Sequence, residues 1–136
     1  MKAEFVIHAA PMGKARPRVT AHGTYTPKKT KDYEQFIKNE YGLQCRGIYF
    51  GGAPVQIAIH AFFEPPKSTS KKAREEMLSG NRMPTKKPDA DNIAKMVCDA
   101  LNGYAWVDDS QVTSLIVVKQ YSETECVRVV IQEVEP

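Results

Sequence analysis

The chain of 136 residues has few of the residue types that build metal clusters or disulfide frameworks, with three cysteines and three histidines. Cys45, Cys98 and Cys126 are far apart and odd in number, which argues against a CxxC zinc motif or a disulfide set. We therefore expect buried free thiols. His8 and His60 fall in strand-like runs, where packed or surface roles are commoner than metal ligation.

Long apolar runs, a Gly-rich phosphate motif, a nucleophile elbow and internal repeats are also missing. No apolar stretch approaches the roughly 20 residues that a membrane-spanning helix needs. The N-terminus is too short and too alternating for a signal peptide. These features predict a cytoplasmic protein without membrane association. At this length, and with 42% hydrophobic residues, one packed domain over residues 1–136 is expected.

Acidic residues are missing from residues 11–31, which carry six basic side chains. Residues 67–88 carry seven basic side chains against two acidic ones. The rest of the chain reverses this balance, with six basic and 14 acidic side chains, so the net charge of +3 hides two cationic segments. Such segments predict that one face of the protein binds a polyanion.

The basic side chains of the first segment include Lys14, Arg16 and Arg18, which alternate. An extended loop would present all three on one side, as a track for backbone phosphates. The alternative is a solvated loop. Tyr25 is suited to stacking on a base or to packing on the helix that follows. The predicted phosphate-contacting residues of both segments are Lys14, Arg16, Arg18, Lys28, Lys29, Lys86 and Lys87.

Hydrophobic periodicity predicts the order β-α-β-α-β-β. The predicted strands are Glu4–Ala9, Val55–Phe63, Val112–Tyr121 and Cys126–Val134, the last two as a hairpin. One main helix should begin near Thr26-Pro27 or Thr30 and end at Gly42 or Gly47. The other should span Asp91–Leu101, face inward with Ile93, Val97, Ala100 and Leu101, and stop at Asn102-Gly103. Basic loops at about 11–29 and 64–88 complete the chain, the second with a short helix near Lys71–Leu78. We expect an α+β single domain with a mixed sheet and two main helices.

The most specific pattern is acidic and adjoins the second basic segment. Asp89 and Asp91 follow Lys86-Lys87, and the pair Asp108-Asp109 follows the next helix. In extended chain a spacing of two directs both carboxylates to one side. A helix from Asp91 places Lys95 and Asp99 on one stripe. The two acidic pairs meet only if this helix returns the chain beside its own start.

Clustered carboxylates without histidine or cysteine are hard oxygen ligands, which suit Mg²⁺ or Mn²⁺. Such a cation can polarise a phosphodiester, activate water and support the departing oxygen. Lys95 is placed to orient the nucleophile or to neutralise developing charge. The pattern therefore indicates phosphodiester hydrolysis.

The same residues also have a purely structural explanation. Asp91 can serve as an N-cap, Lys95 and Asp99 as an exposed charge stripe, and Asp108-Asp109 as turn residues. Trp106, beside the second acidic pair, is more typical of a core residue than of a base-stacking wedge.

The segments DADNIAK (Asp89–Lys95), DAL (Asp99–Leu101) and VDDSQV (Val107–Val112) together resemble the RusA-type Holliday junction resolvases. These are small endodeoxyribonucleases common on phage and prophage elements. The family pattern is D-x-D-N-(apolar)-x-K, a short helix ending in D-A-L, then D-D-x-Q-V before a strand. The basic loop at 11–18 and Tyr25-Thr26-Pro27 look like the phage branch of the family, and the resemblance spans nearly the whole chain.

The resemblance implies a homodimer of RusA-like subunits that resolves four-way DNA junctions by paired symmetric nicks, with Mg²⁺ as cofactor and Mn²⁺ as a substitute. It implies that Asp89, Asp91, Asp109 and Lys95 are catalytic and that Asp89, Asp91, Asp109 and, as an accessory acid, Asp108 hold the metal. The basic residues named above would then contact DNA.

The segment 67–88 is longer and more basic than the corresponding segment of the compact family members. The family's contacts with junction DNA therefore cannot be transferred in detail to this sequence. Two other hypotheses share these features. One is a non-catalytic module that binds branched DNA, and the other is a flap, D-loop or RNA nuclease with the same acidic site.

Overall fold

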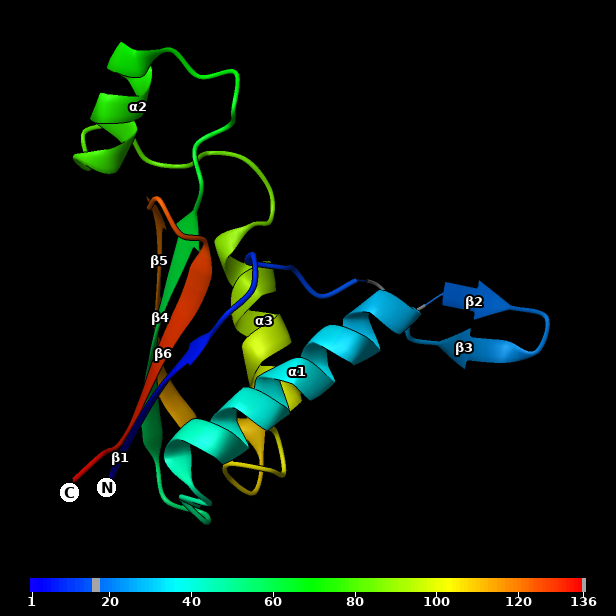
Figure 1. Ribbon diagram of the computed structural model, residues 1–136. Coiled ribbons are helices and arrows are strands. Elements are labelled where there is room, and N and C mark those ends of the chain that lie inside the picture. Colours follow the sequence, from blue (N-terminus) through cyan, green and yellow to red (C-terminus); the bar gives the residue numbers. More distant parts are fainter. Residues whose placement is uncertain (16–17, 136) are drawn as a thin grey trace.

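A four-stranded mixed sheet forms the body of the protein, with two long helices on one face (Figure 1). The computed structural model describes residues 1–15 and 18–135. The elements are β1 (Lys2–Ile7), β2 (Arg18–Thr20), β3 (Gly23–Tyr25), α1 (Lys28–Cys45), β4 (Val55–Phe63), α2 (Lys71–Leu78), α3 (Ala90–Leu101), the short 3-10 helix η1 (Asp109–Gln111), β5 (Val112–Tyr121) and β6 (Cys126–Glu133). The predicted α+β class is confirmed.

The sheet has the order β1-β6-β4-β5, with β4 parallel to β5 and antiparallel to β6. The predicted hairpin between β5 and β6 is therefore wrong, because β4 lies between them. The link between β5 and β6 passes the end of β4, where the Ser122 N–H donates to the Phe63 carbonyl at 2.9 Å. β4 suits the centre because alternate residues are fully buried beneath the helices.

The helix predictions hold closely. α1 follows Pro27 and ends at Cys45. Its C-cap residue Arg46 adopts a left-handed conformation (φ 47°), and Gly47 comes next. Gly42 lies inside the helix and does not stop it. α2 has the expected bounds, and α3 begins at Ala90, one residue before the expected start. Asn102-Gly103 ends α3 as predicted, with Gly103 at φ 73°.

The core lies between the sheet and the helices. α1 packs on β1 and on α3, and α3 also packs on β5. The largest side chains with almost no exposed surface are Trp106, Tyr41, Phe5, Ile7, Ile37, Ile57, Ile59, Ile93, Met96, Leu101 and Ile131. The inward face expected for α3, with Ile93, Val97, Ala100 and Leu101, is buried throughout. In the part of the chain that the structure describes, no helix is long and apolar enough to cross a membrane.

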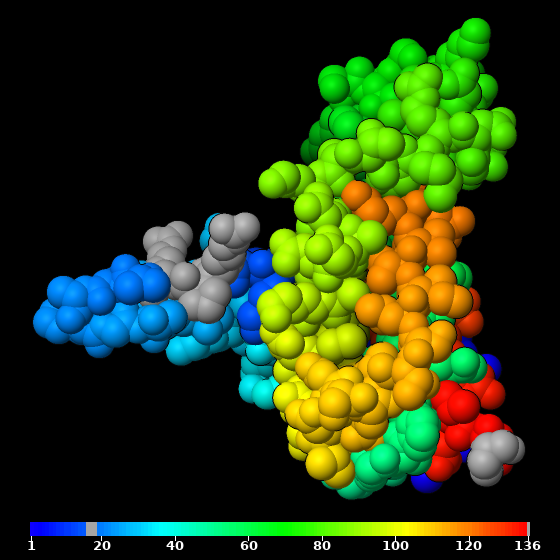
Figure 2. Space-filling model, turned by 180° about the vertical axis from the view of Figure 1, so that it is seen from behind, coloured from blue at the N-terminus to red at the C-terminus, as the bar shows by residue number. Residues whose placement is uncertain are grey.

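Two projections leave this body, one within the first basic segment and one formed by the second (Figures 1 and 2). Strands β2 and β3 form an antiparallel ribbon, called the arm here, that extends from the N-terminal end of α1. The prediction of a loop throughout residues 10–29 is wrong at this point. The second projection holds α2 and extends beyond one end of the sheet. Like-charged segments are stable when they stand apart in solvent, and the fold separates them in this way.

Candidate functional site

Helix α3 lies on the surface between the arm and the α2 projection (Figure 2). It carries the DADNIAK segment, so the first acidic pair lies between the arm of the first basic segment and the projection of the second. Its buried side holds it against the sheet, and the exposed side presents Asp91 and Lys95 to solvent. The fold therefore places carboxylates and lysines where a polyanion held by both projections would pass.

The first acidic pair lies at the start of α3. Asp89 occupies the N-cap position with extended backbone (φ −68°, ψ 152°), but its side chain makes no capping hydrogen bond. Asp91 lies in the first turn, so the explanation of Asp91 as the N-cap is wrong. The argument that an extended D-x-D directs both carboxylates to one side does not apply, because Ala90 and Asp91 are already helical. The helix dipole favours both carboxylates at this end.

The first basic segment contacts this end of α3 directly. The Lys14 N–H donates to the Asn92 carbonyl at 3.3 Å. Gly13 lies so close that an added Cβ would be 2.9 Å from Nδ2 of Asn92. Lys14, Lys87, Asp89 and Asn92 line one groove, which joins the ends of both basic segments to the first acidic pair.

Lys14 was predicted to contact DNA phosphate, but its ammonium group is paired with acidic side chains of the protein. Its ammonium group contacts the carboxylates of Glu34 and Asp99, the latter at 3.2 Å, and the side chain is only 15% exposed. Burial lowers the pKa of Lys14, but the hydrogen bonds to these two acids outweigh burial and raise it. The charge of Lys14 is therefore compensated inside the protein, and a role in DNA binding stays a prediction.

The other predicted phosphate contacts are more open. Lys29, Lys86 and Lys87 are exposed, and Lys28 is exposed but paired with Asp32 at 2.7 Å. The Nζ atom of Lys86 lies 5.9 Å from the centre of the Phe63 ring. The prediction for Arg16 lies outside the described residues. The backbone of Arg18 begins β2, and its side chain is not described.

Asp109 is fixed beside the second half of α3 by two hydrogen bonds. The indole Nε1–H of Trp106 donates to its Oδ1 at 2.9 Å, and its own backbone N–H donates to Oδ1 of Asn102 at 2.9 Å. Trp106 has no exposed surface, so its assignment to the core is confirmed. Burial raises the pKa of Asp109, with further increases from Asp99 and Asp108, while Trp106 and Lys95 oppose the rise.

Asp108 serves the turn that follows α3. Its Oδ2 accepts a hydrogen bond from the Ser110 N–H at 3.1 Å, and Oε1 of Gln111 accepts from the Asp108 N–H at 3.0 Å. This reciprocal pair caps η1. Hydrogen bonding by Ser110 lowers the pKa of Asp108. The structural explanation therefore accounts for Asp108, and its metal-binding role stays a prediction.

A charge stripe connects the two acidic positions along α3. Lys95 Nζ lies 3.7 Å from Oδ2 of Asp99, as the i,i+4 spacing predicts. The distance along the helix axis from Asp91 to Asp99 is about 12 Å at 1.5 Å per residue. Asp99 contacts Lys14 and raises the pKa of Asp109, so it belongs to the site. The sequence placed Asp99 in the stripe and in the DAL segment, and it marked Asn102 only as the end of the helix, so neither residue was predicted as part of the site.

A comparison with known proteins places the chain in a family. The family model of endodeoxyribonuclease RusA matches residues 8–132. The chain belongs to the RusA family. It is also 36% identical over 137 residues to the uncharacterized protein YqaN of Bacillus subtilis (strain 168), with 96% of each chain covered. RusA proteins are endodeoxyribonucleases, so this chain is an enzyme that acts on DNA.

RusA-family nucleases depend on a divalent metal, and the donor chemistry of the site fits one. Asp89, Asp91 and Asp109 offer oxygen ligands only, and the first two are exposed. Among residues 1–15 and 18–135, no three histidine, cysteine or acidic side chains gather into a ready metal cage. Magnesium commonly takes one or two carboxylates and completes its shell with waters and substrate phosphates. The separated acids of this RusA protein suit that mode better than an all-protein cage.

Proposed function

We propose that this RusA-family enzyme is a Mg²⁺-dependent, structure-selective endodeoxyribonuclease that resolves four-way junctions by paired symmetric nicks. One observation carries the proposal: the exposed face of α3, with Asp91 and Lys95, lies between the arm of the first basic segment and the projection formed by the second (Figure 2). Two separated basic surfaces on either side of an acidic site suit DNA that changes direction at a branch better than one straight duplex.

The proposed chemistry assigns a task to each group. Asp89, Asp91 and Asp109 would hold Mg²⁺, which when bound polarises the scissile phosphodiester and lowers the pKa of water. Lys95 is exposed one turn from Asp91, where its ammonium group neutralises charge that develops on the phosphate. Trp106 and Asn102 orient Asp109. The products would carry 5′-phosphate and 3′-hydroxyl ends.

We also propose that the active form is a homodimer. A four-way junction offers two strands for symmetric cutting, and a two-fold dimer brings two matched sites. The edge strand β5 supports this proposal, because its side chains Leu115 and Ile116 are exposed apolar residues beside an unpaired strand edge.

The deciding experiment compares cleavage of a mobile four-way junction with cleavage of plain duplex in Mg²⁺ and in EDTA. We expect nicking of the junction in Mg²⁺ only. Asp91→Asn and Asp109→Asn should abolish nicking while junction binding persists, since the amide keeps the shape but loses the charge. Asp91→Asn cutting at the parent rate would contradict the assignment, and a parent that binds and never cuts would be a branched-DNA-binding module.

The substrate is tested by a panel with equal backbone charge. Four-way junctions, flaps, D-loops and RNA duplexes are compared at one ionic strength, since phosphate contacts depend strongly on salt. We expect the junction to be cut fastest. If flaps, D-loops or RNA are cut faster, the assignment of the acidic site stands, but the four-way junction is not the preferred substrate.

A further inference from the structure

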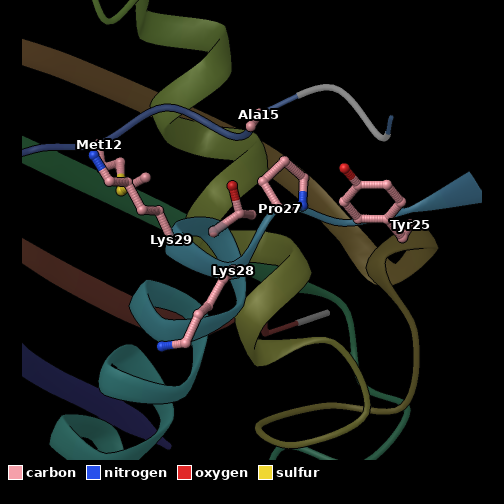
Figure 3. Close-up of a pocket in the computed structure, with 7 residues that line it drawn as sticks. Met12, Ala15, Tyr25, Pro27, Lys28 and Lys29 are labelled. Atoms are coloured by element: carbon pink, nitrogen blue, oxygen red, sulfur yellow. The ribbon is translucent and has the colours of Figure 1, made fainter. Parts of the chain in front are cut away.

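A second cavity lies where the arm joins α1 (Figure 3), and it shares Met12 and Ala15 with the groove at Asp89. Its volume is about 670 Å³, and its lining residues are Met12, Ala15, Tyr25, Pro27, Lys28, Lys29 and Thr30. Among the described lining residues none is acidic. The cavity is therefore positive on balance and partly apolar, a combination that suits an anion with an attached flat group.

The N-terminus of α1 forms one wall of this cavity. Pro27 is the N-cap residue and makes no side-chain capping hydrogen bond, so the cap leaves the first N–H groups of the helix without a side-chain acceptor. The Thr30 and Lys31 N–H groups donate to the Pro27 carbonyl at 3.1 and 3.2 Å. An 18-residue helix whose first turn is uncapped attracts negative charge through its free N–H groups and its dipole.

Thr30 supplies an independent indication of a ligand. The residue has no exposed surface, and its Oγ1 has no hydrogen-bond partner among the residues that the structure describes. A buried unpaired hydroxyl is destabilising, and valine would fill the same space without that penalty. Thr30 is a lining residue of the cavity, so a group bound there can offer this hydroxyl the acceptor that the described residues do not provide.

The two lysines of the wall differ in their freedom. Lys28 is held by Asp32 and points along α1, whereas Lys29 extends toward Met12 (Figure 3). Of these two lysines, Lys29 is the one available to the cavity. Tyr25 lies beside Pro27 and is 46% exposed, so its ring offers a surface on which a base can stack.

We propose that this cavity binds one backbone phosphate of a DNA strand, held by the first N–H groups of α1, the Thr30 hydroxyl and Lys29, with an adjacent base on Tyr25. The proposal rests on the proposed function, because it takes DNA as the ligand. It adds a phosphate site on the arm side of the protein, next to the groove at Asp89. Such a site would fix the position of one DNA strand relative to α3. Mobile lysine side chains on the surface give affinity for DNA without fixing its position.

The test compares Thr30→Val with Thr30→Ser in EDTA, so that no DNA is cut. Thr30→Val should keep or raise the Tm, since it removes an unpaired buried hydroxyl. It should bind the four-way junction about tenfold more weakly, because it loses a hydrogen bond to a charged group. Thr30→Ser should bind like the parent. Parent-like binding by Thr30→Val, or a marked fall in its Tm, would overturn the proposal.

Inorganic phosphate serves as a second probe that does not depend on the proposed function. It should raise the Tm of the parent and of Thr30→Ser, and leave that of Thr30→Val unchanged. No effect on the parent would overturn the phosphate site even if the parent nicks junctions. If Thr30→Val loses the phosphate effect and keeps full junction affinity, the cavity takes free phosphate or a mononucleotide, and the DNA assignment is wrong. If the parent neither binds nor cuts any DNA, the proposed function fails by itself.

The two lysines provide a matched pair. Lys29→Met should reduce the slope of log affinity against log salt by about one, because one phosphate contact is lost. Lys28→Met should change the slope less, since its ammonium group is held by Asp32 and points away from Met12. Equal effects would place both lysines in the diffuse ion atmosphere and contradict a defined site.

Discussion

The indole N–H of Trp106 donates a hydrogen bond of 2.9 Å to Oδ1 of Asp109, so a residue of the hydrophobic core holds a carboxylate at the surface of the RusA site. The backbone N–H of Asp109 is held in turn by Asn102, at the end of α3. Trp106 thus holds the carboxylate of Asp109, and Asn102 holds its backbone. A carboxylate that is already held in its reactive orientation loses less conformational entropy when it binds a metal or substrate.

Replacing Trp106 by Phe should therefore impair the site beyond its effect on stability. The smaller ring leaves a cavity that costs about 1–3 kcal/mol. The loss of the donor should also raise the pKa of Asp109 further, because the Trp106 hydrogen bond lowers it in the parent. A carboxylate holds a metal only when ionised, so activity is lost as the pH falls through this pKa. The acid limb of the nicking profile should move to higher pH, measured well below the Tm. An unmoved limb would show that Asp109 is not the titrating group.

Gly13 should not tolerate a side chain. A Cβ at this position would lie 2.9 Å from Nδ2 of Asn92 and 3.1 Å from Cβ of Pro88. Gly13→Ala should push the start of α3 away from the basic loop, lower the free energy of unfolding by about 1–2 kcal/mol and slow nicking. Gly52→Ala is the control, since no atom lies within 4 Å of its added Cβ. Similar losses in both variants would show that the contact with Asn92 has no special role.

Lys14 and Lys87 should separate structural charge from DNA-binding charge. Lys14→Met leaves Glu34 and Asp99 without a shared cation, so we expect it to lower the free energy of unfolding by about 1–2 kcal/mol. Lys87 is exposed, and Lys87→Ala should keep the Tm and reduce the salt slope of junction binding by about one. A salt slope that changes more in Lys14→Met than in Lys87→Ala would reverse these assignments.

Glu40 should contribute to stability in a pH-dependent way. Burial raises its pKa, but hydrogen bonds from the ring and the backbone N–H of His8 outweigh burial and lower it below the ordinary value of 4.5. A lowered pKa gives stability that is present above 4.5 and is lost as the pH falls through the folded value. Glu40→Gln should therefore lose less stability between neutral and acidic pH than the parent, by thermal unfolding. Glu123→Gln, in an exposed turn, is the control and should follow the parent.

Local sequence patterns predicted most of the elements. The alternation in VQIAIHAFF gives the bounds of β4, and the apolar spacing of Ile93, Val97 and Leu101 gives the buried face of α3, because both signals come from neighbours along the chain. The arm was missed since β2 and β3 have three residues each, too few for a periodic signal. The β5–β6 hairpin was predicted wrongly because a short link also allows a third strand to enter between its neighbours.

The site divides in the same way. The sequence by itself determined the residue types of a phosphodiesterase site, their order along the chain and the two cationic segments, since charge and spacing are properties of the chain. Only the tertiary structure decided which charges remain free: Lys14 is neutralised by Glu34 and Asp99, Asp108 caps a turn, and Asp109 is held by Trp106. The physical reason is that these partners lie on different elements, and packing of the helices on the sheet brings them within hydrogen-bond distance.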